Sequence, residues 1–290
     1  MFFQRKFKLL SFLIGVLFLA LFFNIFNLQI IDREYSLSLV NKQTFDTFYI
    51  QSPRGEIYDS NNNKLVSSSL EPHLFLNLRK VNDNNRGQYE QYIKYNFPEL
   101  KDTFITQLFQ RNSLLVKIVN IQDLNFDNRQ NLDSLDAFEI FDYPVRKYSY
   151  NNIASHIVGY LGEPSFEDGQ EYPLSINSNI VGKSGLERYY QDDLAGQPTQ
   201  VIFKGKDINQ IIKGTPGKNI FTSLDINLQK IATESLLQGI DLANERFEST
   251  NEIQKGAVVV LDIRTNEVVS LVSLPDYNPN NFVDGISRSE

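Results

Sequence analysis

The stretch GAVVVLDIRTNEVVSLVSLPDYNPNNF, residues 256–282, contains two apolar segments followed by a polar tail. AVVVLDI at 257–263 is a near-continuous apolar run of the kind found in strands buried on both faces, and EVVSLVS at 267–273 repeats it after a short polar break. Two strands alone cannot cover their apolar faces, and only proline- and asparagine-rich sequence follows them here. The stretch therefore predicts the first hairpin of a larger domain that is incomplete in these 290 residues.

Upstream of this hairpin, strand and helix patterns are mixed. Asp225 is the predicted N-cap of an amphipathic helix that leads into the hairpin. The mixture predicts an α+β fold of small lobes, joined by polar linkers at 82–88 and 175–179. The other predicted elements are strands at 56–59, 64–66, 73–78, 114–119 and 139–148, a turn at 60–63 that tolerates left-handed backbone, helical segments over 89–109 broken at Pro98, a helix at 122–135, and hairpins over 201–221 that turn at Gly205 and at 214–217.

The N-terminal region carries a membrane-spanning pattern. Residues 9–31 contain no Asp, Glu, Lys or Arg, and at about 1.5 Å per residue they reach about 35 Å, enough to cross a hydrocarbon core of about 30 Å. Basic residues precede this span and acidic residues follow it, so the positive-inside rule predicts a cytoplasmic tail at 1–8 and an exported remainder that begins with a juxtamembrane stalk at 32–50. A cleaved signal peptide is the alternative, although no Ala-x-Ala cleavage site follows the long apolar stretch.

Two asparagines, Asn24 and Asn27, lie in the outer part of the predicted anchor. Polar side chains at this depth either reach the membrane interface or form hydrogen bonds with a second helix. Both interpretations stay open from the residues alone.

Composition excludes several classes of function. The chain contains no cysteine, which removes disulfides, thiol catalysis and cysteine metal sites. Its two histidines, His73 and His156, are too few for a histidine metal site, and no pattern indicates a cofactor. The formal net charge of -7, with no basic stripe, argues against nucleic acid as a partner.

Motifs along the chain resemble those of class B penicillin-binding proteins, and they occur in the same order. GAVVVLD (256–262) and SLPDYNPN (273–280) are similar to the start of the family's transpeptidase domain. RGEIYD (54–59), HIVGY (156–160) and GKSGLERYY (182–190) resemble its non-catalytic pedestal region. The resemblance covers nearly all of the chain beyond its first fifty residues and is closest to the elongation-type members, the penicillin-binding protein 2 group.

The resemblance implies a pedestal of the dimerisation type at 51–224 and the truncated start of a transpeptidase domain at 225–290. Complete members are peptidoglycan D,D-transpeptidases, whose serine in a Ser-x-x-Lys motif is acylated by a stem peptide or a β-lactam. No Ser-x-x-Lys occurs in these 290 residues, so no catalytic residue is assigned and the chain as given is expected to be inactive. Ser175-Ile176-Asn177 and Lys183-Ser184-Gly185 match two further family motifs loosely, but without that serine they indicate no catalysis.

The resemblance also implies partners. The membrane helix and the pedestal are expected to contact a SEDS-family glycosyltransferase and other inner-membrane proteins of the elongation complex, with the bulk of the chain in the periplasm. Peptidoglycan precursors would be partners only of the full-length domain. Three hypotheses follow: a piece of a cell-wall enzyme, a free-standing regulatory pedestal, or an unrelated single-span scaffold or receptor.

Partner-binding and structural roles compete for a small set of residues. Arg54, Gly55 and Asp59 would form either a partner-binding edge or a structural tie across a turn. The 182–190 stretch is typical either of a hinge between lobes or of a helix start packed on a core. Glu187 and the two aspartates after Gln191 are interpreted as a solvated helical face rather than as glycosidase carboxylates. The candidate residues are Asn24, Asn27, Arg54, Gly55, Asp59, Gly182, Gly185, Glu187, Arg188 and Tyr189.

Overall fold

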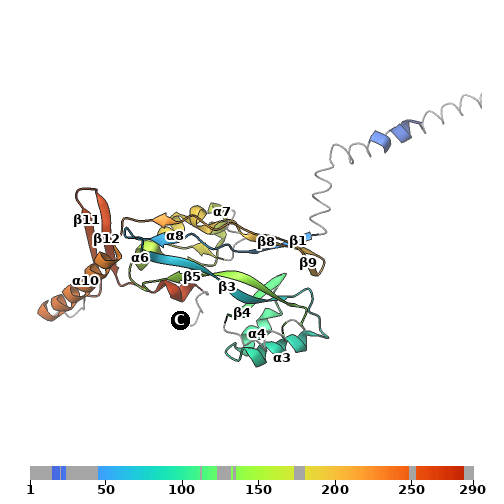
Figure 1. Cartoon of the computed structure of the whole chain (residues 1–290), viewed down its shortest axis with the longest axis horizontal. Coiled ribbons are helices and arrows are strands. Elements are labelled where there is room, and N and C mark those ends of the chain that lie inside the picture. Colours follow the sequence, from blue (N-terminus) through green and yellow to red (C-terminus); the bar gives the residue numbers. More distant parts are fainter. Residues whose placement is uncertain are drawn as a thin grey trace, which may run out of the picture. The chain divides into compact units, whose positions relative to one another are not determined.

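The computed structural model describes residues 15–19, 21–23, 45–111, 113–122, 132, 135–172, 180–247 and 253–283. Helices and strands are interspersed in them, so the predicted α+β class is confirmed (Figure 1). In chain order the elements are β1 (Phe45–Ile50), β2 (Ile57–Tyr58), β3 (Lys64–Asn77), α3 (Arg86–Asn96), α4 (Asp102–Leu108), β4 (Leu115–Asn120), β5 (Phe138–Tyr148), α6 (Ser155–Val158), β6 (Leu161–Gly162), α7 (Phe166–Glu171), β7 (Val181–Gly182), α8 (Gly185–Tyr189), α9 (Gln191–Ala195), β8 (Thr199–Lys204), β9 (Asp207–Ile212), β10 (Ile220–Phe221), α10 (Ile226–Phe247), β11 (Gly256–Asp262), β12 (Glu267–Leu274) and the 3-10 helix η3 (Pro279–Phe282).

The chain divides into two compact units. The smaller comprises Met1–Thr47 and Ile202–Asn209, and the larger comprises Phe48–Val201 and Gln210–Glu290. In the smaller unit, Gly205 has a φ of +66° between β8 and β9, which confirms the turn predicted there. The boundary predicted between pedestal and transpeptidase start falls inside the larger unit and stays a prediction.

The larger unit is built around β3. This strand pairs antiparallel with β5 from Val66 to Leu76, and its C-terminal end also pairs with β4. The strands predicted at 64–66 and 73–78 are therefore one strand, because the serines between them continue the ladder with β5. At the other end, β10 joins β2 in parallel, so it is not part of the hairpins predicted over 201–221.

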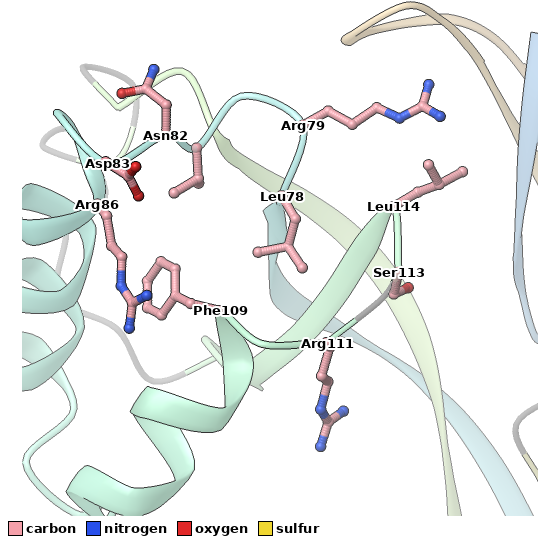
Figure 2. A pocket seen from close by; sticks show the side chains of 10 residues that line it. Leu78, Arg79, Asn82, Asp83, Arg86, Phe109, Arg111, Ser113 and Leu114 are labelled. Atoms are coloured by element: carbon pink, nitrogen blue, oxygen red, sulfur yellow. The ribbon is translucent and has the colours of Figure 1, made fainter.

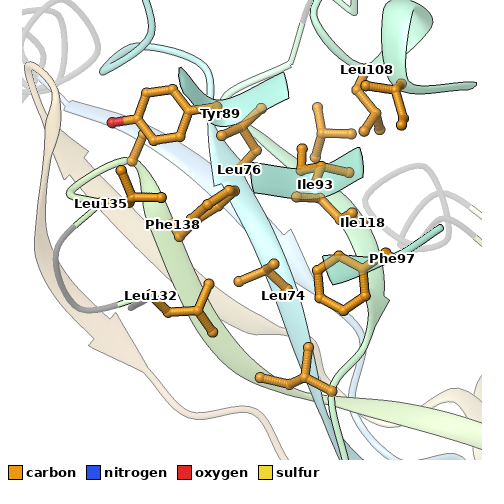
Figure 3. Packing of buried hydrophobic residues seen from close by; sticks show 14 residues of the cluster. Leu74, Leu76, Tyr89, Ile93, Phe97, Leu108, Ile118, Leu132, Leu135 and Phe138 are labelled. Carbon is orange, nitrogen blue, oxygen red and sulfur yellow. The ribbon is translucent and has the colours of Figure 1, made fainter. Parts of the chain in front are cut away.

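Two apolar cores stabilise the larger unit. The first, which we call the helical-lobe core, packs α3 and α4 against β3, β4 and the start of β5 (Figure 3). Tyr89, Ile93 and Phe97 enter it at helical spacing, while Leu74 and Leu76 enter it at strand spacing. The second, the base core, contains Ile57, Leu65, Val66, Tyr148, Val158, Leu194, Leu224 and Ile226.

The C-terminal hairpin forms as predicted, but its strands are not buried on both faces, which differs from the prediction. β11 pairs antiparallel with β12, yet Val259 and Leu261 are 57% and 56% exposed. Gln229 of α10 donates to the carbonyl of Leu271 and accepts from the hydroxyl of Ser270, so α10 is tied to β12. Among the described residues, the helix covers one face of the hairpin and the apolar face that carries Val259 is left uncovered.

Several predicted segments lie outside the described residues. These are most of the anchor at 9–31, most of the helix at 122–135, and the linker at 175–179. Within the described ranges, no helix combines the length and apolarity needed to cross a bilayer. The anchor therefore stays a prediction, whereas the end of the predicted stalk at 32–50 forms strand β1.

Candidate functional site

The RGEIYD and GKSGLERYY motifs, far apart in the sequence, meet inside the larger unit. Arg54 Nη2 lies 3.0 Å from one carboxylate oxygen of Glu187, and Arg146 Nη2 of β5 lies 2.7 Å from the other. Arg54, Arg146 and Glu187 are 7%, 5% and 0% exposed. Tyr148 and Gln191 complete the group, at 2% exposure each. We call Arg54, Arg146, Tyr148, Glu187 and Gln191 the charge cluster.

Hydrogen bonds compensate the burial of most of these polar groups; Arg146 Nη2 has its ion-pair contact with Glu187 and no hydrogen bond. Arg54 Nη2 also donates to Gln191 Oε1 at 3.0 Å, and the same oxygen accepts the backbone N–H of Gly182 at 2.9 Å. Arg146 Nη1 donates to the carbonyl of Gly55 at 2.7 Å. Two guanidinium groups against one carboxylate leave one net positive charge, so these carbonyl contacts matter, because a buried charge without partners is costly.

Burial and ion pairing act in opposite directions on Glu187. Burial by itself would raise the pKa of this carboxyl, but Arg146 and then Arg54 hold the pKa below its ordinary value. Burial raises the pKa of Tyr148 well above its ordinary value, and the adjacent Glu187 raises it further. At neutral pH the charge cluster therefore contains one carboxylate, two guanidinium groups and a neutral phenol.

The charge cluster corrects two interpretations drawn from the sequence and gives a structural reason for Gly55. Glu187 does not lie on a solvated helical face, because α8 directs it between two arginines. Arg54 is tied to Glu187 and not to Asp59, which accepts backbone N–H groups of the 60–63 turn and of the first residue of α10. Position 55 needs a glycine because another backbone segment approaches it closely: a Cβ there would lie 1.8 Å from the carbonyl oxygen of Lys218.

The GKSGLERYY motif forms a packed bend and the start of α8. Gly185 has a φ of +57°, and a Cβ on Gly182 would lie 2.1 Å from the carbonyl oxygen of Glu187. The bend also contacts HIVGY: Gly159 has a φ of +79°, and a Cβ there would lie 1.9 Å from the carbonyl oxygen of Ser184. Such close backbone contacts agree with the helix-start interpretation and leave little room for a hinge at these glycines.

The remaining candidates are at the surface or outside the description. Arg188 Nη2 pairs with Glu171 at 2.7 Å, and both side chains are partly exposed. The Tyr189 ring is exposed and contacts the ring of Tyr190 edge-on. Asn24 and Asn27 lie outside the described residues.

The SLPDYNPN motif lies against the HIVGY region, and we call this contact, made by residues 275–282, the seam. His156 Nε2 lies 2.9 Å from the carbonyl oxygen of Pro275. Tyr277 packs edge-on against the His156 ring, and its hydroxyl donates to the carbonyl of Ser155 at 3.0 Å. His156 therefore holds the segment that follows the hairpin.

Asn280 connects the seam to β5. Its Oδ1 accepts the backbone N–H of Tyr148 at 2.9 Å, and its Nδ2 donates to the carbonyl of the same residue at 3.0 Å. The side-chain amide thus pairs with the end of β5 as a neighbouring strand would. The rings of Tyr160 and Phe282, with centroids 4.4 Å apart, add an apolar contact. Because Tyr148 belongs to the charge cluster as well, the cluster and the seam share a residue.

Sequence reasoning missed Arg146, Tyr148 and Asn280 as functional candidates. The one available signal was an arginine within the strand-like stretch 139–148, where a buried charge implies a partner. That partner lies on a different element, so no local pattern names it. Chemically, the arrangement holds backbone segments together; its carboxylate is occupied by two arginines and is not placed to act as a general base.

The chain is similar to known proteins in sequence and in fold. The family model described as the penicillin-binding protein dimerisation domain matches residues 49–222. The peptidoglycan D,D-transpeptidase MrdA of Escherichia coli (strain K12) is 29% identical over 299 residues, covering 96% of this chain and 44% of the relative. MrdA of Haemophilus influenzae is 30% identical, covering 99% of this chain and 44% of the relative.

Among solved structures, the complex between penicillin-binding protein 2 and MreC from Helicobacter pylori is similar, with a TM-score of 0.63 and 25% identity. The match covers 84% of this chain and 45% of that one. The chain therefore spans less than half the length of these relatives.

Proposed function

This chain belongs to the penicillin-binding protein dimerisation-domain family, and on that premise we propose that it is the N-terminal part of a peptidoglycan D,D-transpeptidase of cell-wall synthesis and cell-shape maintenance. In this proposal its own role is to anchor the enzyme in the inner membrane, to bind partners, and to hold the start of the transpeptidase domain. The alternative of an unrelated scaffold or receptor is excluded by the family match.

The seam is the observation that carries this proposal. A non-catalytic base can position a catalytic domain only if the two are joined by more than a flexible linker. Here Asn280 and Tyr277 fix the chain after β12 through side-chain and backbone hydrogen bonds. The uncovered apolar face of β11 and β12 is the surface that the rest of a transpeptidase domain would cover.

Partners of the elongation complex follow from the same proposal. The Helicobacter pylori relative is described in complex with MreC, and a comparable partner is proposed for this chain. A SEDS-family glycosyltransferase in the inner membrane is proposed as a second partner, contacted through the predicted anchor at 9–31 and residues 51–224.

We expect the chain to co-purify with the SEDS glycosyltransferase of its host and to disturb cell shape by competing with the full-length enzyme. Replacing residues 9–31 by an unrelated apolar helix is expected to weaken the association, because helix packing in membranes depends on the identity of the facing side chains. Affinity purification of both versions, with membrane insertion verified for each, measures this. If neither version co-purifies while both insert, the partner-binding role is wrong.

We expect a topology with the N-terminus in the cytoplasm. Basic residues before the apolar span and acidic residues after it favour this orientation. Alkaline phosphatase, which is active only outside the cytoplasm, should be active when fused after Asp59 and inactive when fused before residue 9. The reverse pattern would contradict the orientation.

We expect no covalent labelling of the purified chain by fluorescent penicillin. Acylation needs an activated serine, and these 290 residues contain no Ser-x-x-Lys. A full-length MrdA labelled in parallel serves as the positive control. Labelling that survives denaturation and is lost in Ser175→Ala or Ser184→Ala would reveal a nucleophile. Ser184 Oγ lies 3.5 Å from the hydroxyl of Tyr277 at the seam.

A further inference from the structure

A pocket of about 510 Å³ opens in the helical lobe, between the segment after β3, the start of α3, the end of α4 and the start of β4. Figure 2 shows Leu78 and Phe109 toward its middle, with Arg79 and Arg111 extending outward at its rim. Val81 and Leu114 add apolar wall. Its volume is in the range of ligand-binding pockets, about 300–1,000 Å³.

The charge lining this pocket is opposite in sign to that of the chain. Three arginines, Arg79, Arg86 and Arg111, line it against a single acidic residue, Asp83, although the chain as a whole has a formal net charge of -7. Glu90 neutralises one of the arginines, since its carboxylate accepts from Arg86 Nε at 2.7 Å. Arg111, at the rim, forms no ion pair with any described residue.

Arg86 and Arg111 have guanidinium N–H groups that form no hydrogen bond with any described residue. Arg86 is held over the Phe109 ring at 5.0 Å, and it uses only Nε for its ion pair with Glu90. The Arg111 side chain makes no hydrogen bond or ion pair with any described residue. Arg86 is thus pre-positioned beside an aromatic wall, and Arg111 is able to turn toward a bound anion.

We propose that this pocket binds an extended peptide segment of a partner protein in which an acidic side chain lies next to an aliphatic or aromatic one. The apolar walls take the apolar side chain, and Arg86 and Arg111 donate to the carboxylate. A protein segment fits better than a small molecule, because the pocket is open to solvent and a small-molecule site buries most of its ligand. The inference stands on the helical lobe alone and does not need the proposed enzyme activity.

Fluorescence anisotropy of the purified full chain tests the proposal with three labelled peptides. The first is Gly-Ser-Leu-Asp-Phe-Ser-Gly; the second has asparagine in place of aspartate, and the third has glycine in place of leucine and phenylalanine. We expect saturable binding of the first below about 1 mM, and binding weaker by about tenfold or more for the other two. Raising the salt to about 0.5 M should weaken the first further, because the ion pairs lie at an exposed rim.

Two variants locate the site. Arg111→Glu should weaken binding of the first peptide about tenfold or more, and Arg111→Gln should weaken it less, while neither should change thermal unfolding because Arg111 has no partner to lose. Arg264→Glu, the same charge change on an exposed arginine of the β11–β12 turn, is the matched control and should bind as the native chain does. Absence of binding at 1 mM, equal binding of all three peptides, or equal effects of Arg111→Glu and Arg264→Glu would each overturn the proposal.

Discussion

Replacing Glu187 by glutamine is expected to destabilise the chain by about 3–5 kcal/mol, since the change removes one partner of a buried ion pair. Arg54 and Arg146 would keep their charges, at 7% and 5% exposure, with no carboxylate to neutralise them. Glutamine preserves the shape of the side chain, so the loss reports charge rather than packing. Urea unfolding followed by circular dichroism measures the change in the free energy of unfolding.

Glu171→Gln is the matched control for this measurement. Glu171 pairs with Arg188 at 2.7 Å, but at the surface, where ion pairs contribute little to stability. The pH dependence gives a second check. Because the pKa of Glu187 is held below its ordinary 4.5 in the folded chain, its carboxylate contributes fully above that value, and the contribution is lost as the pH falls through the folded pKa. The native chain and the glutamine variant should therefore converge in acid, and a difference that persists unchanged there would contradict the electrostatic explanation.

Gly55→Ala is expected to cost about 3 kcal/mol or more, at the upper end of overpacking effects. The added Cβ would lie 1.8 Å from the carbonyl oxygen of Lys218, and a backbone atom cannot rotate away as a side chain can. Separating these segments would also disturb the backbone bond from Gly55 N–H to Leu194 and the contact of Arg146 with the Gly55 carbonyl. Thermal and urea unfolding of the purified variant measure the loss.

Gly239→Ala provides a control with the opposite sign. Gly239 is within α10, and a Cβ there would meet nothing within 4 Å, so alanine should stabilise the helix by about 0.5–1 kcal/mol. Equal unfolding midpoints for the Gly55 and Gly239 variants would show that the close approach at Gly55 is not needed.

The Glu187 and Gly55 substitutions both act on the charge cluster, which is joined to the seam through β5. Arg146 and Tyr148 lie two residues apart on this strand, and the backbone of Tyr148 forms two hydrogen bonds with the side chain of Asn280. A variant that loosens the charge cluster is therefore expected to loosen the segment at 275–282 as well. In the proposed full-length enzyme, that segment would belong to the start of the transpeptidase domain.

Local sequence patterns determined much of the fold of this protein. The alternation and apolar runs at 257–263 and 267–273 are strands, the segments around Pro98 are helices, and the 60–63 turn contains Asn62 with a φ of +62°. Each depends on interactions between residues a few positions apart, which a single sequence displays. The ordered motifs likewise indicated the family, because each is a short stretch that can be recognised without knowing its neighbours in space.

The tertiary structure decided which residues those motifs bring together. Periodicity reports which side of an element is apolar, but it carries no information on which distant element packs there. Arg54 and Glu187 are 133 positions apart in the sequence. Only the packing of α8 against the start of the larger unit makes them a buried ion pair. From the sequence, Arg54 is a candidate for a surface edge and Glu187 for a solvated helix face. The same holds for Gly55 and Asn280. The close backbone approach at Gly55 and the pairing of the Asn280 amide with β5 each exist only after two distant segments have packed together.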